Sequence, residues 1–295
     1  MSTYSTAWKG PDMRICRFND DRLGIIREGR IHDVTPVAKE LGTFSYPLPR
    51  FDPMIARLSE LLPLFDRFAR TSPPVDVSEV KLLSPIANPG KVIAAPVNYQ
   101  KHLEEAAADT KTFPQHHVRR IHETGLFLKA TSSVVGPGEG VQVRFPDRRT
   151  DHEIELAVVI GKSCNEVAAS AALDVVAGYL IGLDMTVRGP EERSLRKSVD
   201  SYTVLGPWFV TADEIGDPSG LPFELLVNGE VRQSANTRDL VIDTPGLIEF
   251  ASKFYTLEPG DVLLTGTPEG VAPVKPGDRI RATIDKIGTM DVLVR

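Results

Sequence analysis

The chain has 295 residues, of which 41% are hydrophobic, and a net charge of −6 at pH 7. This length permits one large domain or two unequal ones. The negative charge argues against a nucleic acid or an anionic membrane surface as the main partner. No apolar stretch approaches a membrane span, and the first ten residues lack a signal-peptide core. Two unrelated cysteines, Cys16 and Cys164, form no disulfide or zinc pattern, so we expect a cytoplasmic location.

Strands separated by turns are predicted for residues 13–35, and the apolar spacing over 53–70 predicts a helix. We place a small N-terminal domain at residues 1–84 and a larger domain at residues 85–295. In the larger domain, residues 91–95 are typical of a buried strand, and residues 102–108 are typical of a helix. The polar stretch 109–123 is interpreted as a mobile lid.

The rest of the larger domain contains many short apolar runs separated by Gly, Pro and Asp. Asn228-Gly229 predicts a two-residue hairpin turn. Residues 245–255 are predicted to form a helix with Thr244 as its N-cap and Pro245 as its first residue. The overall pattern predicts a mixed α/β fold that is mostly β.

Three acidic residues stand in runs that are otherwise apolar. Glu153 and Glu155 are two apart, so a strand would project both carboxylates from one face. Asp184 ends a second apolar run. Adjacent buried carboxylates repel one another unless a cation lies between them, and oxygen ligands favour Mg²⁺, Mn²⁺ or Ca²⁺. The alternative is a solvated edge strand at the two glutamates and a turn cap at Asp184.

His102 and Glu105 are three residues apart, so a helix would place them on one face. The carboxylate would orient the imidazole, and the histidine would activate a water molecule or carry a proton. The alternative is an ordinary surface pair. Lys197 would orient a carbonyl or help to move a proton beside a metal. Alternatively, Lys197 is a surface lysine.

Arg188 follows Asp184 by four residues, and arginine is the natural bidentate partner of a substrate carboxylate. Alternatively, Arg188 forms an ion pair with Glu191 or Glu192. A strand at residues 263–264 runs into a Gly/Pro loop at residues 265–271. The backbone amides and small hydroxyl groups of such a loop bind a carboxylate in some proteins, although an ordinary turn has the same composition.

Taken together, these segments resemble the fumarylacetoacetate hydrolase family from about Lys91 to the C-terminus. The motifs that carry the resemblance are Asn98-Tyr99-x-x-His102-x-x-Glu105, Leu126-Phe127-Leu128-Lys129, His152-Glu153-Ile154-Glu155, Asp184-Met185-Thr186-Val187-Arg188, Lys197 with Leu205-Gly206-Pro207-Trp208, and Leu264-Thr265-Gly266-Thr267-Pro268-Glu269-Gly270.

This resemblance implies a β-sandwich roll, a homodimer, and Mg²⁺ or Mn²⁺ held by the acidic trio Glu153, Glu155 and Asp184. It implies 2-oxo or 2,4-diketo acid substrates, which undergo C–C hydrolysis, decarboxylation or tautomerisation. By motif match, Lys197 is the lysine beside the metal, and His102 and Glu105 form a dyad on a closing lid. Arg188 and Thr267 match positions that contact the substrate.

The expected reaction is hydrolysis of an acylpyruvate. A decarboxylase or tautomerase of oxaloacetate-like diacids, or a metal-binding protein without catalysis, are the alternatives. Glu191 stands where relatives often carry glutamine, and an acid there would weaken the binding of a second anionic group. The sequence therefore predicts a substrate contact at Glu191 and a preference for monoacid acylpyruvates.

Overall fold

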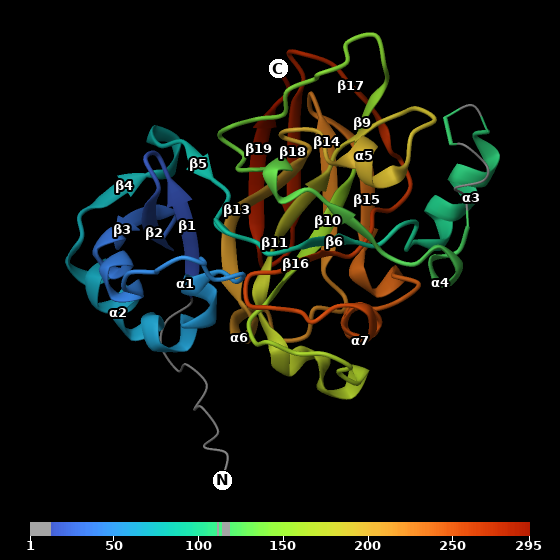
Figure 1. The fold of residues 1–295 in the computed structure, drawn as a ribbon. Helices are drawn as coiled ribbons and strands as arrows, with labels where there is room; N and C mark the ends of the chain where they lie inside the picture. The colour runs from blue at the N-terminus through green and yellow to red at the C-terminus, as the bar shows by residue number, and fades with distance from the viewer. Residues whose placement is uncertain (1–12, 111, 114–118) are drawn as a thin grey trace.

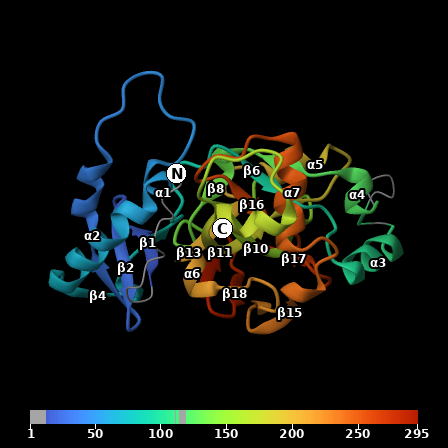
Figure 2. The same ribbon diagram turned by 90° about the horizontal axis from the view of Figure 1, so that it is seen from below.

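The computed structural model of the protein describes residues 13–110, 112–113 and 119–295. In this part of the chain strands account for more residues than helices do, which confirms the mixed, mostly β fold. The first strands and helices form a lobe at one end of the molecule, and α3 (Gln100–Ala108) and α4 (Ile121–Thr124) lie at the opposite end (Figures 1 and 2). Part of the predicted lid, residues 111 and 114–118, lies outside the described residues.

A 12-stranded sheet runs through the described part of the chain. Its main path, in spatial order, is β4 (Pro74–Asp76), β3 (Arg30–Asp33), β2 (Arg22–Arg27), β1 (Arg14–Phe18), β13 (Thr203–Thr211), β11 (Val176–Asp184), β10 (Ile154–Ile160), β16 (Val262–Leu264), β6 (Val92–Ala94) and β7 (Phe127–Lys129). Two further short strands join its side, β5 (Leu82–Leu83) on β1 and β8 (Val134–Val135) on β13.

Two smaller sheets complete the β structure. One contains β12 (Thr186–Val187), β9 (Thr150–His152) and β17 (Ala272–Val274), and the other contains β15 (Glu230–Asn236), β14 (Pro222–Val227), β18 (Arg279–Ile284) and β19 (Gly288–Leu293). The remaining helices are α1 (Pro53–Ala56), α2 (Leu58–Thr71), α5 (Arg193–Lys197), α6 (Ala212–Ile215) and α7 (Thr244–Phe254).

The large sheet is continuous between the N-terminal lobe and the rest of the protein. Strand β1 pairs with β13 through Arg14 and Ile15, opposite Val210 and Phe209. One apolar cluster contains residues of α1 and α2 together with residues of β6, β10 and β16. The lobe therefore shares its core with the larger part, and the domain boundary at residue 84 stays a prediction.

Strand β10 is buried on both faces, and its alternate residues enter two different apolar clusters. Leu156 and Val158 pack in the cluster that includes β14, β18 and β19, whereas Ala157 and Val159 pack in the cluster that includes α1 and α2. This alternation follows from the two-residue period of a strand. Glu155 has the same parity as Ala157 and Val159, so its side chain projects from the face of β10 that packs in the second cluster.

Local sequence signals explain several element boundaries. The hairpin predicted at Asn228-Gly229 is confirmed between β14 and β15, and both residues have the positive φ that its turn requires. The predicted N-cap of α7 is wrong by one residue. Asp243 is the N-cap, because its side chain accepts a hydrogen bond from the Gly246 amide, and Thr244 is already helical.

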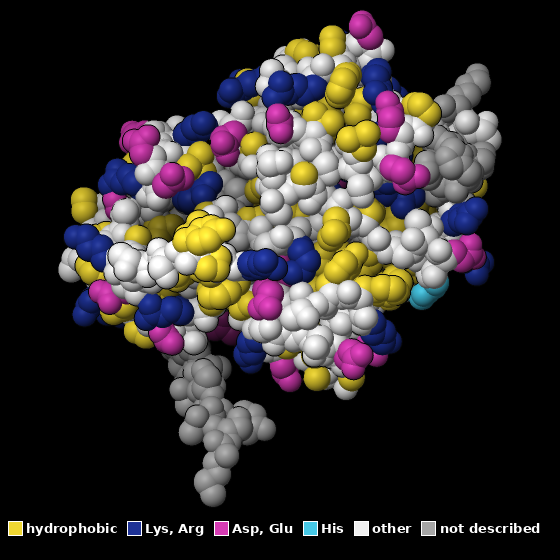
Figure 3. Space-filling model, in the orientation of Figure 1, with side chains coloured by type: hydrophobic (Ala, Val, Ile, Leu, Met, Phe, Trp, Pro, Cys, Tyr) yellow, Lys and Arg dark blue, Asp and Glu magenta, His cyan; other side chains and the backbone are white. Residues whose placement is uncertain are grey.

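No helix among the described residues is long and apolar enough to cross a membrane. On the face drawn in Figure 3, basic and acidic side chains are interspersed, with small apolar patches between them.

Candidate active site

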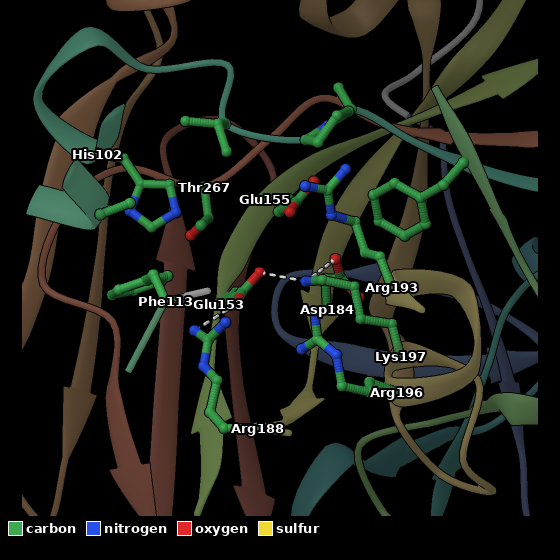
Figure 4. Close-up of a pocket in the computed structure, with 15 residues that line it drawn as sticks. His102, Phe113, Glu153, Glu155, Asp184, Arg188, Arg193, Arg196, Lys197 and Thr267 are labelled. Atoms are coloured by element: carbon green, nitrogen blue, oxygen red, sulfur yellow. Dashed lines mark hydrogen bonds and ion pairs between the residues drawn. The ribbon is translucent and has the colours of Figure 1, made fainter. Parts of the chain in front are cut away.

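The three acidic residues predicted as metal ligands meet at the end of the paired strands β10 and β11. Glu153 lies between β9 and β10, Glu155 lies in β10, and Asp184 ends β11. The Asp184 amide donates to the Glu153 carbonyl over 2.9 Å, which places the two residues side by side. All three side chains are buried, which excludes a solvated edge strand. Glu153 lies at the break between β9 and β10 rather than inside one strand. The side chains of Glu153 and Glu155 nevertheless face the same site, as predicted (Figure 4).

Cationic side chains neutralise part of this acidic cluster. The Lys197 ammonium group lies 2.6 Å from Glu153 Oε2 and 2.6 Å from Asp184 Oδ2. Lys197 is 6% exposed, so the interpretation as a surface lysine is wrong. Lys129 forms a second ion pair with Asp184 and also donates to the Lys197 carbonyl over 2.5 Å. Lys129 belongs to a motif that carried the family resemblance, but the sequence assigned it no role.

The two glutamates differ in their electrostatic surroundings. Burial raises the pKa of Glu153, but the charges of Lys197 and Arg188 outweigh burial and lower the pKa to about 2. The pKa of Glu155 is raised well above its usual value by burial and then by the charge of Asp184. Metal-free, the trio therefore holds one carboxyl group that is stabilised by a proton or by an added cation.

The acidic trio fits a divalent cation. One ligand oxygen from each carboxylate lies within 4.8 Å of the other two, and all three residues are buried. Hard ions such as Mg²⁺ and Mn²⁺ prefer oxygen ligands of this kind. A cation would also relieve the repulsion that raises the pKa of Glu155, so the chemistry of the donor set agrees with its geometry.

Metal binding is expected to release a proton from Glu155. The raised pKa means that this carboxyl group retains its proton to a higher pH than usual in the metal-free protein, and a cation binds only the ionised form. Affinity for Mn²⁺ should therefore rise with pH. Calorimetric titrations in two buffers of different ionisation enthalpy measure the proton released. Equal binding enthalpies in both buffers would contradict this expectation.

The predicted dyad is present on α3. His102 Nδ1 lies 2.8 Å from Glu105 Oε2, and His102 is 5% exposed. The imidazole packs edge-to-face on Phe113, with ring centroids 5.8 Å apart. His102 lines the same pocket as the three acids, and Figure 4 shows it across this pocket from α5. The pair is therefore more than an ordinary contact on a helix surface.

The loop after β16 joins the dyad to the acidic trio. The Gly266 amide donates to Glu155 Oε2 over 2.6 Å, and the Gly270 amide donates to Glu105 Oε1 over 2.9 Å. Gly266 has φ of +105°, and a Cβ atom there would lie 2.7 Å from the Asn98 Cβ, so only glycine fits. Thr267 of this loop lines the pocket, as predicted.

Gln233 holds this loop through hydrogen bonds to Thr267 and Pro268, and no sequence motif predicts this role. Its amide nitrogen donates to Thr267 Oγ1 over 2.8 Å, and its oxygen accepts from the Ile154 amide over 3.2 Å. The pairing of β14 with β15 shifts beside it, since Leu225 faces Gln233 and Leu226 faces Val231. This bulge turns Gln233 into the core.

Arg188 lines the pocket beside the acidic trio, as predicted, and its contact with substrate stays a prediction. Arg188 Nε lies 2.6 Å from Asp151, and a terminal nitrogen lies 3.1 Å from Glu153, so the suggested pairs with Glu191 or Glu192 are wrong. The Glu191 carboxylate binds Arg148 over 2.7 Å and 3.0 Å. The charge of Arg148 therefore offsets the Glu191 charge on which the predicted preference for monoacid substrates depends. Glu191 does not line the described pocket, and its contact with substrate stays a prediction.

The pocket is a cavity of about 50 Å³ at the centre of these groups. Ligand pockets usually measure about 300–1,000 Å³, so side chains have to move before a diketo acid enters. Its lining comprises Ala95, Pro96, Val97, His102, Ala106, Phe113, Phe127, Glu153, Glu155, Asp184, Arg188, Arg193, Arg196, Lys197 and Thr267.

A buried three-carboxylate site that faces a histidine–glutamate dyad defines a metal-dependent enzyme. The family model for the C-terminal region of fumarylacetoacetate (FAA) hydrolase matches residues 91–295. The chain belongs to the fumarylacetoacetate hydrolase family.

Individual relatives cover nearly the whole chain. Maleylpyruvate hydrolase of Aquipseudomonas alcaligenes is 54% identical over 96% of this chain and 99% of that protein. Maleylpyruvate hydrolase of Sphingobium sp. SYK-6, solved with manganese(II) and pyruvate, is 40% identical with a TM-score of 0.81, covering 96% of this chain and 98% of that one. The mitochondrial oxaloacetate tautomerase of Rattus norvegicus is 33% identical over 95% of this chain and 90% of that protein. Together with the acidic trio, the manganese-bound relative supports Mg²⁺ or Mn²⁺ as cofactor.

Proposed function

We propose that the protein hydrolyses a C–C bond of acylpyruvates, with maleylpyruvate as the first substrate to test. The observation that carries this proposal is the His102–Glu105 dyad beside the acidic trio, because hydrolysis needs both an activated water molecule and an electrophilic centre. The similarity to two maleylpyruvate hydrolases supports the choice of substrate.

The site residues divide the chemistry between them. When bound by Glu153, Glu155 and Asp184, a divalent cation supplies Lewis acidity for the 2-oxo end of the substrate. His102, oriented through Nδ1 by Glu105, takes a proton from water at its other ring nitrogen. The water oxygen joins C4, the C3–C4 bond breaks, and C3 receives a proton. Maleylpyruvate would thus give maleate and pyruvate.

Lys197 contributes positive charge at the point where negative charge develops. Its ammonium group already lies between Glu153 and Asp184, and its Nζ lies 5.7 Å from the centre of the Phe127 ring. A fixed ammonium group stabilises an enolate more strongly in a buried site than in water. We assign Lys197 this electrostatic role and the delivery of the proton to C3.

Tautomerisation or decarboxylation of an oxaloacetate-like diacid is the second candidate, because an oxaloacetate tautomerase is among the relatives. Neither reaction needs an attacking water molecule. Product analysis with acetylpyruvate, maleylpyruvate, fumarylpyruvate and oxaloacetate decides between the candidates. Release of pyruvate and an acid in equal amounts is expected. Loss of CO₂, or a change of tautomer without cleavage, would overturn the proposal.

A homodimer and a cytoplasmic location stay predictions from the sequence and the resemblance. Light scattering coupled to size-exclusion chromatography measures the oligomeric state, and a mass of one chain would contradict the dimer.

A further inference from the structure

Three cationic side chains of one short helix face the same wall of the pocket. Arg193, Arg196 and Lys197 are spaced three and four residues apart on α5, so they share a helix face, and all three line the cavity. Figure 4 shows them on one side of the acidic trio, with His102 on the other side. These three residues form the basic wall of the pocket.

Arg188, the arginine predicted from the sequence to contact the substrate carboxylate, lines the pocket but is already bound to protein carboxylates. It pairs with Asp151 and Glu153, and its guanidinium lies 4.6 Å from the centre of the Phe113 ring. The positive charge of Arg188 is therefore balanced before any substrate arrives.

The arginines of α5 have different surroundings. Arg196 donates to the carbonyl groups of Glu191 and Val187 over 2.8 Å and 3.3 Å, and both acceptors are neutral. Burial and then the charge of Arg196 lower the pKa of Arg193, while burial and then the charge of Arg188 lower the pKa of Arg196. The basic wall is thus stabilised by an added anion.

The net charge of the whole pocket also favours the binding of an anion. The lining residues together with their buried ion-pair partners Lys129 and Asp151 comprise five arginine and lysine side chains and four carboxylates, which leaves one positive charge when all of them are ionised. A bound divalent cation raises this excess to three positive charges. A substrate that carries one or two carboxylates offsets part of the excess, and its charge is placed best beside α5.

Phe127 holds Arg193 in place for this contact. The Arg193 guanidinium carbon lies 5.6 Å from the centre of the Phe127 ring, and Phe127 lines the pocket beside it. A cation–π contact with an aromatic ring limits the positions that the guanidinium group takes. A guanidinium group can donate two parallel hydrogen bonds to a carboxylate.

We propose that Arg193 binds the 1-carboxylate of the 2-oxo acid, so that the acyl carbons extend toward His102 and Phe113. The dyad lies across the acidic trio from α5, so C4 is attacked at one wall while the carboxylate is held at the other. The direction of the acyl chain rests on the proposed function. The carboxylate contact does not, because it applies to pyruvate as well.

Arg193→Met tests the contact, since methionine keeps an unbranched stem against Phe127 and removes the charge. The manganese-loaded protein is titrated with pyruvate and with methyl pyruvate, a neutral ester. Loss of a charge-assisted hydrogen-bond pair should weaken pyruvate binding by about tenfold or more, with little change for the ester. KM for acetylpyruvate and for maleylpyruvate should rise by similar factors, and Arg193→Lys should restore part of the affinity.

Arg144→Ala is the matched control, because Arg144 is an exposed arginine whose ion pair with Asp200 lies outside the pocket. Equal losses for pyruvate and methyl pyruvate, or no loss for either, would overturn the proposal. An effect confined to maleylpyruvate would also overturn it, since Arg193 would then bind the distal carboxylate. If wild-type protein binds pyruvate but cleaves no acylpyruvate, the proposed function fails while the titrations still decide the role of Arg193.

Discussion

Replacing Glu153 and Glu155 together by alanine should abolish Mg²⁺ and Mn²⁺ binding in calorimetry and lower kcat/KM for acylpyruvate cleavage by about 10³-fold or more. The two residues provide two of the three carboxylates whose oxygens lie within 4.8 Å of one another. The remaining acid, Asp184, already forms ion pairs with Lys129 and Lys197. One carboxylate neutralised by two ammonium groups has little affinity for a divalent ion.

Because both glutamates are buried, the alanine variant requires a matched partner that preserves shape. Glu153→Gln with Glu155→Gln keeps the side-chain volume and removes both negative charges, so it should also lose metal while the circular dichroism spectrum stays unchanged. Glu191→Gln is the control, since that acid lies outside the pocket in an ion pair with Arg148. Unchanged metal affinity in a folded double variant would refute the assignment of these ligands.

Removal of the dyad histidine gives the second large effect. His102→Ala should lower kcat for C–C hydrolysis by about 10²-fold or more, the range expected for loss of a general base. The affinity for Mn²⁺ should change little, because His102 is not one of the three oxygen donors. Steady-state kinetics with saturating metal measure the first quantity, and calorimetry measures the second.

Helix α3 offers a matched control for the carboxylate of the dyad. Glu104 and Glu105 are neighbours, but Glu105 binds His102, whereas Glu104 binds the exposed Gln100 side chain. Glu105→Gln should therefore lower kcat, and Glu104→Gln should not. If both substitutions reduce only the melting temperature and leave turnover intact, the pair has a structural role and another group activates the water.

The parts of the site that were predictable follow from short-range patterns. Glu153, Glu155 and Asp184 stand out because acids in apolar strand-like runs need a positive partner. His102 and Glu105 stand out because three residues span one helix turn. The burial of Lys197 has no such signal in composition, and the resemblance to the family was the main reason to place it beside the metal.

The features that were missed depend on contacts between distant segments. Arg148, 43 residues before Glu191 in the chain, pairs with its carboxylate, and no local pattern indicates this pair. The preference for monoacid substrates stays a prediction. Gln233 reaches Thr267 because of a bulge that no local pattern reveals. The spacing of Arg193, Arg196 and Lys197 was readable as one helix face, and this signal could have identified the basic wall.

The backbone amides of Gly266 and Gly270 fix the distance between the metal site and the His102–Glu105 dyad. The Gly266 amide binds the carboxylate of Glu155, and the Gly270 amide binds the carboxylate of Glu105. The length of the 266–270 segment therefore sets the distance between the acidic trio and the dyad. An insertion or deletion in this segment would change that distance and impair the reaction, even with every side chain of the site retained. Because the proposed direction of the acyl chain runs toward His102 and Phe113, natural divergence toward new acyl groups is expected to accumulate at that wall of the pocket, while the 266–270 segment keeps its length.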